Sequence, residues 1–313
     1  MENNIYKSEL KLNFKSLSRV IVSPRSLKAL YKNIDFESED LFDLYGNKNF
    51  NKKMEDISII YPFYSYNERK LNMDSKDINY YLPGSSIKGS LFSGEKNIMC
   101  DDVKLKENDI VLDWIYKVVD YKEEVKQGIK SNLKIPKYKE FFENIGIEML
   151  NSEKNFEVIV RVFGNSEENI SEKLEDTNKK TIRKLVFFIS KIKEVLNSIE
   201  TDKSKTNKTE ISENLAKENI TENSEEISKM NTTKNLKEIL NNIENIKEKY
   251  KKKDNKKIIT FLGGFKGKVG TTSKTGTSSK IGENIKTGLY FDNKTKLPYG
   301  LIEIEVLNKS VPN

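Results

Sequence analysis

The 313-residue sequence predicts an α+β fold with antiparallel sheets. Some segments show the period-two alternation of apolar and polar residues that is typical of strands, and others show helical spacing. Strands and helices do not alternate regularly along the chain, as they would in a doubly wound sheet. Two amphipathic helices are expected in the second half of the chain. A glycine-rich tract then separates two short strands, and glycine favours loops because its backbone loses the most entropy on ordering.

A strand is predicted at residues 9–22, because Leu10, Leu12 and Phe14 alternate with polar and charged residues. Residues 155–163 predict a buried strand that is rich in β-branched and aromatic residues. The remaining elements expected in this part are a short helix at 26–32, an acidic loop at 35–43, an edge or bulged strand at 57–66 and a short helix at 137–144. Residues 103–121 mix strand-like and helical patterns, with an apolar helical stripe.

Residues 170–199 carry the strongest helical signal, with apolar residues at steps of three and four. A charged insertion at 200–257 follows. Its first half, to about Thr233, has too little apolar surface to pack and predicts disordered or loosely helical chain. Its second half predicts a helix from the spacing of Leu236, Ile239, Leu240, Ile243 and Ile246. Strands are expected at 257–262 and 301–306, on either side of the glycine-rich loop at 263–288.

Composition narrows the classes of function. The chain has 55 basic and 48 acidic residues, a net charge of +7, which suits a polyanionic partner. It has no histidine and one cysteine, which excludes Cys/His zinc sites and removes the commonest general base, whereas magnesium sites made of carboxylates alone remain compatible. With no disulfide, no signal sequence and no long apolar run, we expect a soluble cytoplasmic protein that makes no membrane contact.

The segment PGSSIKG, residues 83–89, predicts a turn into a helix. We expect Pro83 to fix one backbone angle, Gly84 to permit a positive φ, a serine to cap the helix, and a lysine to lie in its first turn. Such a helix start binds phosphate, although a capped turn with a solvated lysine fits the spacing equally well. The candidate anion-binding residues are Gly84, Ser85, Ser86, Lys88 and Gly89.

The tract at 262–282 alternates lysines with glycines and hydroxyl residues, so that a flexible backbone carries many donors toward a sugar-phosphate chain. It does not contain the G-x-x-x-x-G-K-[ST] phosphate loop of NTPases. A flexible surface linker is the alternative interpretation. The candidate RNA-binding residues of this tract are Gly264, Lys266, Gly267, Lys268, Thr271, Ser273 and Lys274.

Four segments together carry a family resemblance: YLPGSSIKG at 81–89, IPKYKEFFENIGIEM at 135–149, LGGFKGKVGTTSKTG at 262–276 and LPYGLIEIEV at 297–306. They resemble the RAMP superfamily of CRISPR proteins, and most of all the type III-A effector subunit that caps the guide RNA toward its 3′ end. The resemblance implies two ferredoxin-like, RRM-related halves, at 1–155 and 156–313. The second half would include the helical or disordered insertion at 200–257.

The resemblance also implies a non-catalytic subunit that binds CRISPR RNA (crRNA), caps the backbone filament near the crRNA 3′ end, and supports crRNA maturation and antiviral defence. It implies no cofactor and no metal. The implied partners are crRNA, target RNA indirectly, a neighbouring RAMP backbone subunit, the small helical subunit of the complex, and host nucleases that trim crRNA.

Three other functions remain open on the sequence. A metal-dependent subunit that cleaves target RNA would use an aspartate in the loop after the first strand, where Asp35, Asp40 and Asp43 lie. A guide-processing endoribonuclease shares the glycine-rich loop, but the absence of histidine disfavours it. A structural protein would use the basic loop to contact acidic protein surfaces.

Overall fold

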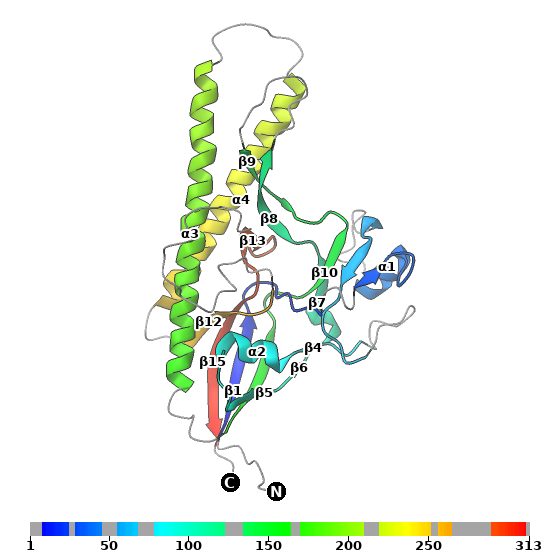
Figure 1. Cartoon of the computed structure of the whole chain (residues 1–313), viewed down its shortest axis with the longest axis vertical. Helices are drawn as coiled ribbons and strands as arrows, with labels where there is room; N and C mark the ends of the chain where they lie inside the picture. Colours follow the sequence, from blue (N-terminus) through cyan, green and yellow to red (C-terminus); the bar gives the residue numbers. More distant parts are fainter. Residues whose placement is uncertain are drawn as a thin grey trace.

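The computed structural model describes residues 8–24, 29–45, 55–67, 78–122, 134–163, 170–209, 219–251, 256–264 and 289–310. Over these residues the fold is α+β, as the sequence predicts, with several mainly antiparallel sheets and two long helices. Figure 1 shows the long helices α3 and α4 along one flank of the molecule, with the sheets beside them.

The largest sheet has five strands, all paired antiparallel. Its order is β12 (Lys257–Phe261), β15 (Leu301–Ser310), β1 (Ser8–Ser16), β11 (Asn155–Val162) and β5 (Ile98–Cys100). The predicted strands near the two ends of the chain and at 155–163 are thereby confirmed. Since β1 and β5 precede residue 155 while β12 and β15 follow it, this sheet joins both predicted halves. The division at residue 155 itself stays a prediction.

Three smaller sheets complete the β structure of the described residues. The second contains β2 (Leu30–Tyr31), β3 (Ile59–Tyr61), β10 (Ile145–Leu150) and β7 (Ile110–Asp113), and the third contains β14 (Leu297–Pro298), β13 (Leu289–Asp292), β8 (Tyr116–Lys122) and β9 (Lys134–Glu140). A two-stranded sheet pairs β4 (Tyr81–Leu82) with β6 (Val103–Lys104). The β3–β10 pair is parallel, which departs from the antiparallel expectation.

Two helical expectations for the middle of the chain are wrong. Residues 103–121 form β6, a 3-10 turn at Glu107–Asp109, β7 and β8 instead of a helix. Residues 137–140 belong to β9, which pairs with β8 over seven positions from Tyr116–Glu140 to Lys122–Lys134. The strand pairing supplies the backbone hydrogen bonds that a helix would otherwise make, so tertiary context overrides the helical spacing.

Three further expectations near the N-terminus also need correction. Residues 30–31 form β2 instead of part of a helix, and residues 25–28 lie outside the described part of the chain. Helix α1 (Ser38–Tyr45) begins within the expected acidic loop. Strand β3 ends immediately before Pro62, which lacks the donor needed to extend the pairing, but β3 has neighbours on both sides and is not an edge strand.

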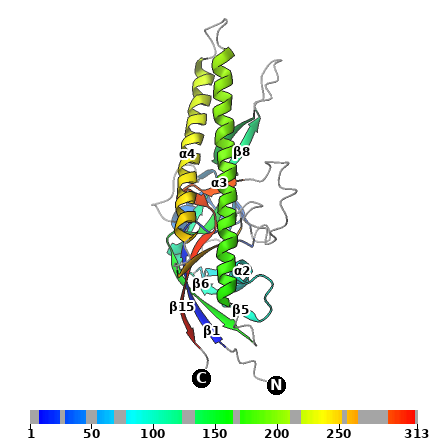
Figure 2. The ribbon, with the colours of Figure 1, turned by 90° about the vertical axis from the view of Figure 1, so that its left-hand side faces the viewer.

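The two long helices pack side by side over much of their length, as Figure 2 shows. Helix α3 (Ile170–Thr209) starts where the sequence predicts, and α4 (Asn219–Lys251) contains the predicted helix at 236–246. Of the two alternatives expected for the segment to about Thr233, disordered or loosely helical, the described residues are helical, since both helices extend into that segment. Its composition explains this, because lysine and glutamate favour helices and neither glycine nor proline interrupts them. Among the described helices, none is long and apolar enough to cross a membrane.

Two large apolar clusters lie on opposite sides of the β12–β15 part of the sheet. On one side, helix α2 (Gly84–Leu91) contributes Ile87 and Leu91 to the cluster that contains Leu12, Phe14 and Val158. On the other side, α3 and α4 pack on Ile259, Phe261 and Leu301. Layers of this kind are the usual way for a sheet to bury both faces.

A buried carboxylate ties the end of α4 to the sheet. Glu303 is 6% exposed and accepts hydrogen bonds from the Tyr250 hydroxyl and from Lys257 Nζ, the latter at 3.0 Å. Burial favours the protonated carboxyl, but these hydrogen bonds outweigh it and lower the pKa of Glu303. Asn178 of α3 accepts a 3.0 Å hydrogen bond from the Ile259 N–H, which covers the outer edge of β12.

Candidate nucleic-acid interface

The PGSSIKG segment forms the start of α2, as predicted, but its cap differs from the expectation. Pro83 occupies the N-cap position with extended backbone angles, and Ser85 and Ser86 both lie inside the helix. The N–H of Gly84 donates a 2.7 Å hydrogen bond to Oδ1 of Asp102, a residue of the turn between β5 and β6. A carboxylate at a helix start also complements the helix dipole. No local sequence signal pointed to Asp102, because it lies 18 residues further along the chain.

Gly84 is needed for close packing, and it does not use the positive φ that glycine permits. The described glycines with positive φ are Gly94, Gly263 and Gly300. A Cβ atom at Gly84 would overlap the carbonyl oxygen of Cys100 and lie 2.7 Å from its carbonyl carbon. Burial raises the pKa of the Cys100 thiol to about 12, although the nearby Lys88 ammonium partly opposes this shift. The N-terminal turn of α2 therefore lies directly on the β5 backbone.

The outer face of α2 carries a hydroxyl, an ammonium and a bare stretch of backbone. Gly84, Ile87 and Leu91 are buried, whereas Ser85 and Gly89 are exposed. Lys88 is half-buried and belongs to the last turn instead of the expected first turn. Since residues three and four apart share a helix face, Ser85, Lys88 and Gly89 lie together. A Cβ atom at Gly89 would have no neighbour within 4 Å, so the backbone there is open to a ligand.

The glycine-rich tract starts from a tight backbone junction at the end of β12. Gly263 has φ +84°, and a Cβ atom there would overlap the Ile21 carbonyl oxygen. The Gly264 N–H donates to this same oxygen at 2.6 Å, and the Leu262 N–H donates to the Gly300 carbonyl at 2.8 Å. Only glycine adopts this backbone without strain, so the junction fixes where the tract begins.

Six of the predicted RNA-binding residues lie outside the described residues, because the structure describes the tract only as far as Gly264. They are Lys266, Gly267, Lys268, Thr271, Ser273 and Lys274.

A buried ion cluster lies close to the junction, where the Gly300 N–H donates to the Arg19 carbonyl, and no sequence pattern pointed to it. The Arg19 guanidinium pairs with Asp113 and, at 3.7 Å, with the fully buried Asp292. The backbone N–H of Arg19 also donates to Asp292 Oδ2 at 3.0 Å. Burial disfavours the guanidinium charge, but the two carboxylates outweigh it and raise the pKa of Arg19. The cluster links the chain after β1 to β7 and β13, and so holds the junction in place.

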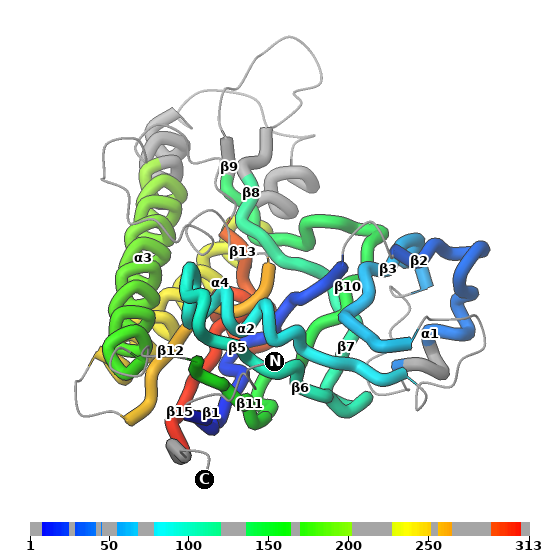
Figure 3. Tube along the Cα trace, turned by 60° about the horizontal axis from the view of Figure 1, so that its bottom comes forward, coloured from blue at the N-terminus to red at the C-terminus, as the bar shows by residue number. Residues whose placement is uncertain are grey.

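The structure brings α2 together with the start of the glycine-rich tract. The Thr260 hydroxyl of β12 donates to the Ser90 carbonyl of α2 at 3.3 Å. Ile87 and Leu91 of α2 share one apolar cluster with Leu262. Figure 3 shows α2 and the end of β12 in the same central part of the molecule. Two segments about 180 residues apart in sequence therefore meet in space.

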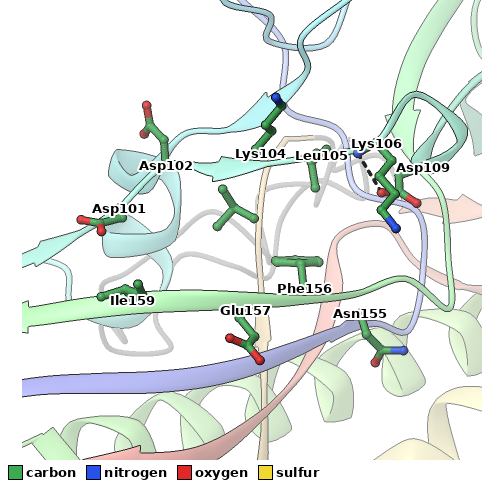
Figure 4. Close-up of a pocket in the computed structure, with 11 residues that line it drawn as sticks. Asp101, Asp102, Lys104, Leu105, Lys106, Asp109, Asn155, Phe156, Glu157 and Ile159 are labelled. Atoms are coloured by element: carbon green, nitrogen blue, oxygen red, sulfur yellow. Dashed lines mark hydrogen bonds between the residues drawn. The ribbon is translucent and has the colours of Figure 1, made fainter. Parts of the chain in front are cut away.

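A pocket of about 370 Å³ lies behind the start of α2, along the part of β11 that extends beyond β5. Figure 4 shows Leu105 and Phe156 within it and charged side chains around it. Several of those carboxylates already have partners: Asp101 pairs with Arg161, and Asp102 accepts from Gly84. Carboxylates outnumber lysines in the lining of this pocket, so its charge disfavours an anion, and the outer face of α2 is the better candidate.

The aspartates considered for catalysis serve local structure where the structure describes them. Asp35 Oδ2 accepts from the Tyr31 N–H at 2.8 Å, and Asp40 Oδ2 accepts from the Glu37 N–H at 2.7 Å. The side chain of Asp43 lies outside the described atoms. Within the described part of the chain, no group of three or more acidic or cysteine side chains is placed to hold a metal ion.

No protein-family model matches the chain, and no curated protein matches it significantly.

Proposed function

We propose that this chain is a non-catalytic crRNA-binding subunit of a type III-A CRISPR effector complex. In this proposal the fold consists of two ferredoxin-like, RRM-related halves that meet near residue 155, and the protein acts in the cytoplasm. It caps the backbone filament near the crRNA 3′ end and supports crRNA maturation and antiviral defence. Its neighbours are a RAMP backbone subunit and the small helical subunit, it meets target RNA indirectly, and host nucleases trim the crRNA.

The observation that carries the proposal is the meeting of α2 with the start of the glycine-rich tract. The outer face of α2 offers the Ser85 hydroxyl, the Lys88 ammonium and the open backbone at Gly89. The tract that begins beside it at Gly264 has five lysines and one acidic residue between positions 265 and 288. Lysines, hydroxyls and accessible backbone are the groups that bind a sugar-phosphate chain independently of its sequence.

Asp102 changes which atoms of α2 would contact phosphate. Because its carboxylate already accepts the Gly84 N–H, that N–H is taken and a negative charge lies at the helix start. The phosphate contact therefore falls to Ser85, which directly follows Gly84, and to Lys88, one turn along the helix. This arrangement favours a chain of phosphates that passes across the outer face of α2 over a single anion bound at its end.

The salt dependence of RNA affinity tests the proposal. The full chain would be titrated onto a fluorescent single-stranded RNA between about 50 and 200 mM salt, where each phosphate contact contributes roughly 0.7 to the slope of log affinity against log salt. Lys88→Ala and Lys266→Ala should each lower the slope by about that amount, and affinity should be independent of RNA sequence. Lys179→Ala is the matched control, since Lys179 pairs with Glu175 on α3. Equal slopes for all four proteins would rule out the RNA-facing assignment.

A further inference from the structure

The third sheet has one covered face and one face rich in lysine. Its covered face packs against the long helices, since Val118, Tyr138 and Phe291 belong to or pack on their apolar cluster. The Tyr138 N–H also donates to the Thr232 hydroxyl of α4 at 3.3 Å. Figure 1 shows β8 and β9 beside α4, extending away from the five-stranded sheet.

Side chains alternate along a strand, so the neighbours of these covered residues lie on the other face. Lys117 on β8 is directly opposite Lys139 on β9, and Tyr290 on β13 is directly opposite Lys117. Lys137 lies two residues from Lys139 and therefore on the same face. Like charges directly opposite each other across two strands are unfavourable, so this face concentrates positive charge at a cost to the fold.

Two aromatic rings hold one of these lysines in position. The Lys117 ammonium lies 4.3 Å from the ring centre of Phe141 and 5.3 Å from that of Tyr290. The two rings meet edge to face with their centres 5.6 Å apart. An ammonium over aromatic rings keeps its charge and loses some of its rotational freedom. Lys139 pairs with Glu143 at 3.9 Å, but both side chains are largely exposed, so this contact is weak.

Both ends of the glycine-rich tract lie beside this face. At its start, Gly264 is bonded to Ile21, and Phe141 and Tyr290 pack against the apolar cluster that contains Ile21. At its end, the tract leads into β13 at Leu289, one residue before Tyr290. The glycine-rich tract therefore starts and ends beside the lysine-rich face of the third sheet.

We propose that the face formed by Lys117, Lys137 and Lys139 is a second binding surface for the phosphate backbone of single-stranded RNA. In this proposal Phe141 and Tyr290 position Lys117, and the lysines contact phosphates without reading bases. The inference rests on the proposed function, because it extends the RNA path from α2 and the glycine-rich tract onto β8 and β9. An acidic protein surface is the competing partner. We favour RNA because the glycine-rich tract, which is rich in lysine and hydroxyl residues, begins and ends beside this face.

The test uses the full chain and a fluorescent single-stranded RNA of mixed sequence, with affinity measured over a range of salt. The Lys117→Ala/Lys139→Ala double variant should bind several-fold more weakly and lower the salt slope by about 1.4, or roughly 0.7 for each lost contact. Phe141→Leu should weaken binding less while it preserves the salt slope, since the lysine remains but is less well positioned. Because the double variant removes a like-charge pair, its thermal midpoint should remain close to that of the unaltered chain, and this separates lost binding from lost folding.

The possible results separate this inference from the proposed function. If Lys88→Ala lowers the salt slope and the double variant does not, the lysine face is not an RNA surface, while the proposed function stands. If the unaltered chain binds no RNA, the proposed function fails and the lysine face fails with it. If the double variant binds RNA normally but loses a co-purifying acidic subunit, the face binds protein and the inference is overturned.

Discussion

Replacing Gly84 by alanine should destabilise the protein strongly, although glycine-to-alanine changes in helices usually stabilise them. The new Cβ atom would overlap the Cys100 carbonyl oxygen and lie 2.7 Å and 2.9 Å from the carbonyl carbons of Cys100 and Asp101. All three are backbone atoms of β5 and the following turn and cannot rotate away. Helix α2 would have to shift, and the 2.7 Å hydrogen bond from the Gly84 N–H to Asp102 would be strained or lost.

The size of this effect follows from three contributions. Overpacking costs about 1–3 kcal/mol. Losing a hydrogen bond to a charged acceptor costs about 1.5–3 kcal/mol. The better helix propensity of alanine returns at most about 1 kcal/mol. We therefore expect Gly84→Ala to lower the free energy of unfolding by about 2–4 kcal/mol, as a shift of the urea midpoint with an unchanged slope.

Gly89→Ala is the matched control, because it makes the same change in the same helix. A Cβ atom at Gly89 has no neighbour within 4 Å, so this variant should be as stable as the unaltered chain or more stable by up to about 1 kcal/mol. If RNA passes over α2, the added methyl group should still weaken RNA binding. Equal urea midpoints for the two variants would refute the packing of α2 on the β5 backbone.

Three other predictions concern single side chains. Asp102→Asn should cost about 0.5–2 kcal/mol of stability in urea unfolding by weakening the α2 cap, and it should tighten RNA binding by removing a negative charge beside the proposed phosphate path. The Cys100 thiol, whose pKa is raised to about 12 by burial, should react with alkylating reagents at pH 8 only as fast as the protein unfolds; rapid labelling would contradict its burial. Glu303→Gln should cost about 1–3 kcal/mol at neutral pH. Because the hydrogen bonds of the Glu303 carboxylate lower its pKa in the folded state, this stabilisation is present above its ordinary pKa of about 4.3 and disappears as the pH falls through the folded value, so the two proteins should become equally stable in acid.

Periodicity predicted those elements that bury one face against a single apolar cluster. Strand β1 buries Leu10, Leu12 and Phe14 in one cluster, so its alternation was a reliable signal. The middle of helix α3 likewise buries Leu185 and Ile192 in one cluster with α4, while its first two turns bury Ile170 and Leu174 in the cluster that contains α2. In such elements the sequence pattern reflects one neighbour, and period two or period 3.6 survives intact.

The expected helix within 103–121 failed because its apolar residues serve different neighbours. Ile110, Trp114, Ile115 and Val118 have helical spacing, but each belongs to a different apolar cluster of the structure. The chain runs as β7 and β8 through the region where these clusters meet. Burial on several sides produces closely spaced apolar residues in a strand, and periodicity alone does not distinguish this from a helix.

The candidate site was predictable only in its local part. The start of α2 followed from the Pro83–Gly84 pair, whose effects on the backbone are local. The Asp102 cap and the pairing of Arg19 with Asp292 depend on residues 18 and 273 positions apart, and one sequence carries no signal for such contacts. The lysine pair across β8 and β9 was hidden for a related reason, since residues 137–144 were expected to form a helix.

The central claim is that α2 and the glycine-rich tract hold one sugar-phosphate chain together. Photo-crosslinking of the full chain to a single-stranded RNA with one 4-thiouridine, followed by mass spectrometry of the adducts, tests it most directly. As the modified nucleotide is moved along the RNA, the account predicts that neighbouring positions crosslink to peptides containing Gly84–Gly89 and to peptides from 262–276. Adducts confined to other segments, or crosslinks to the two segments only from distant nucleotides, would contradict it.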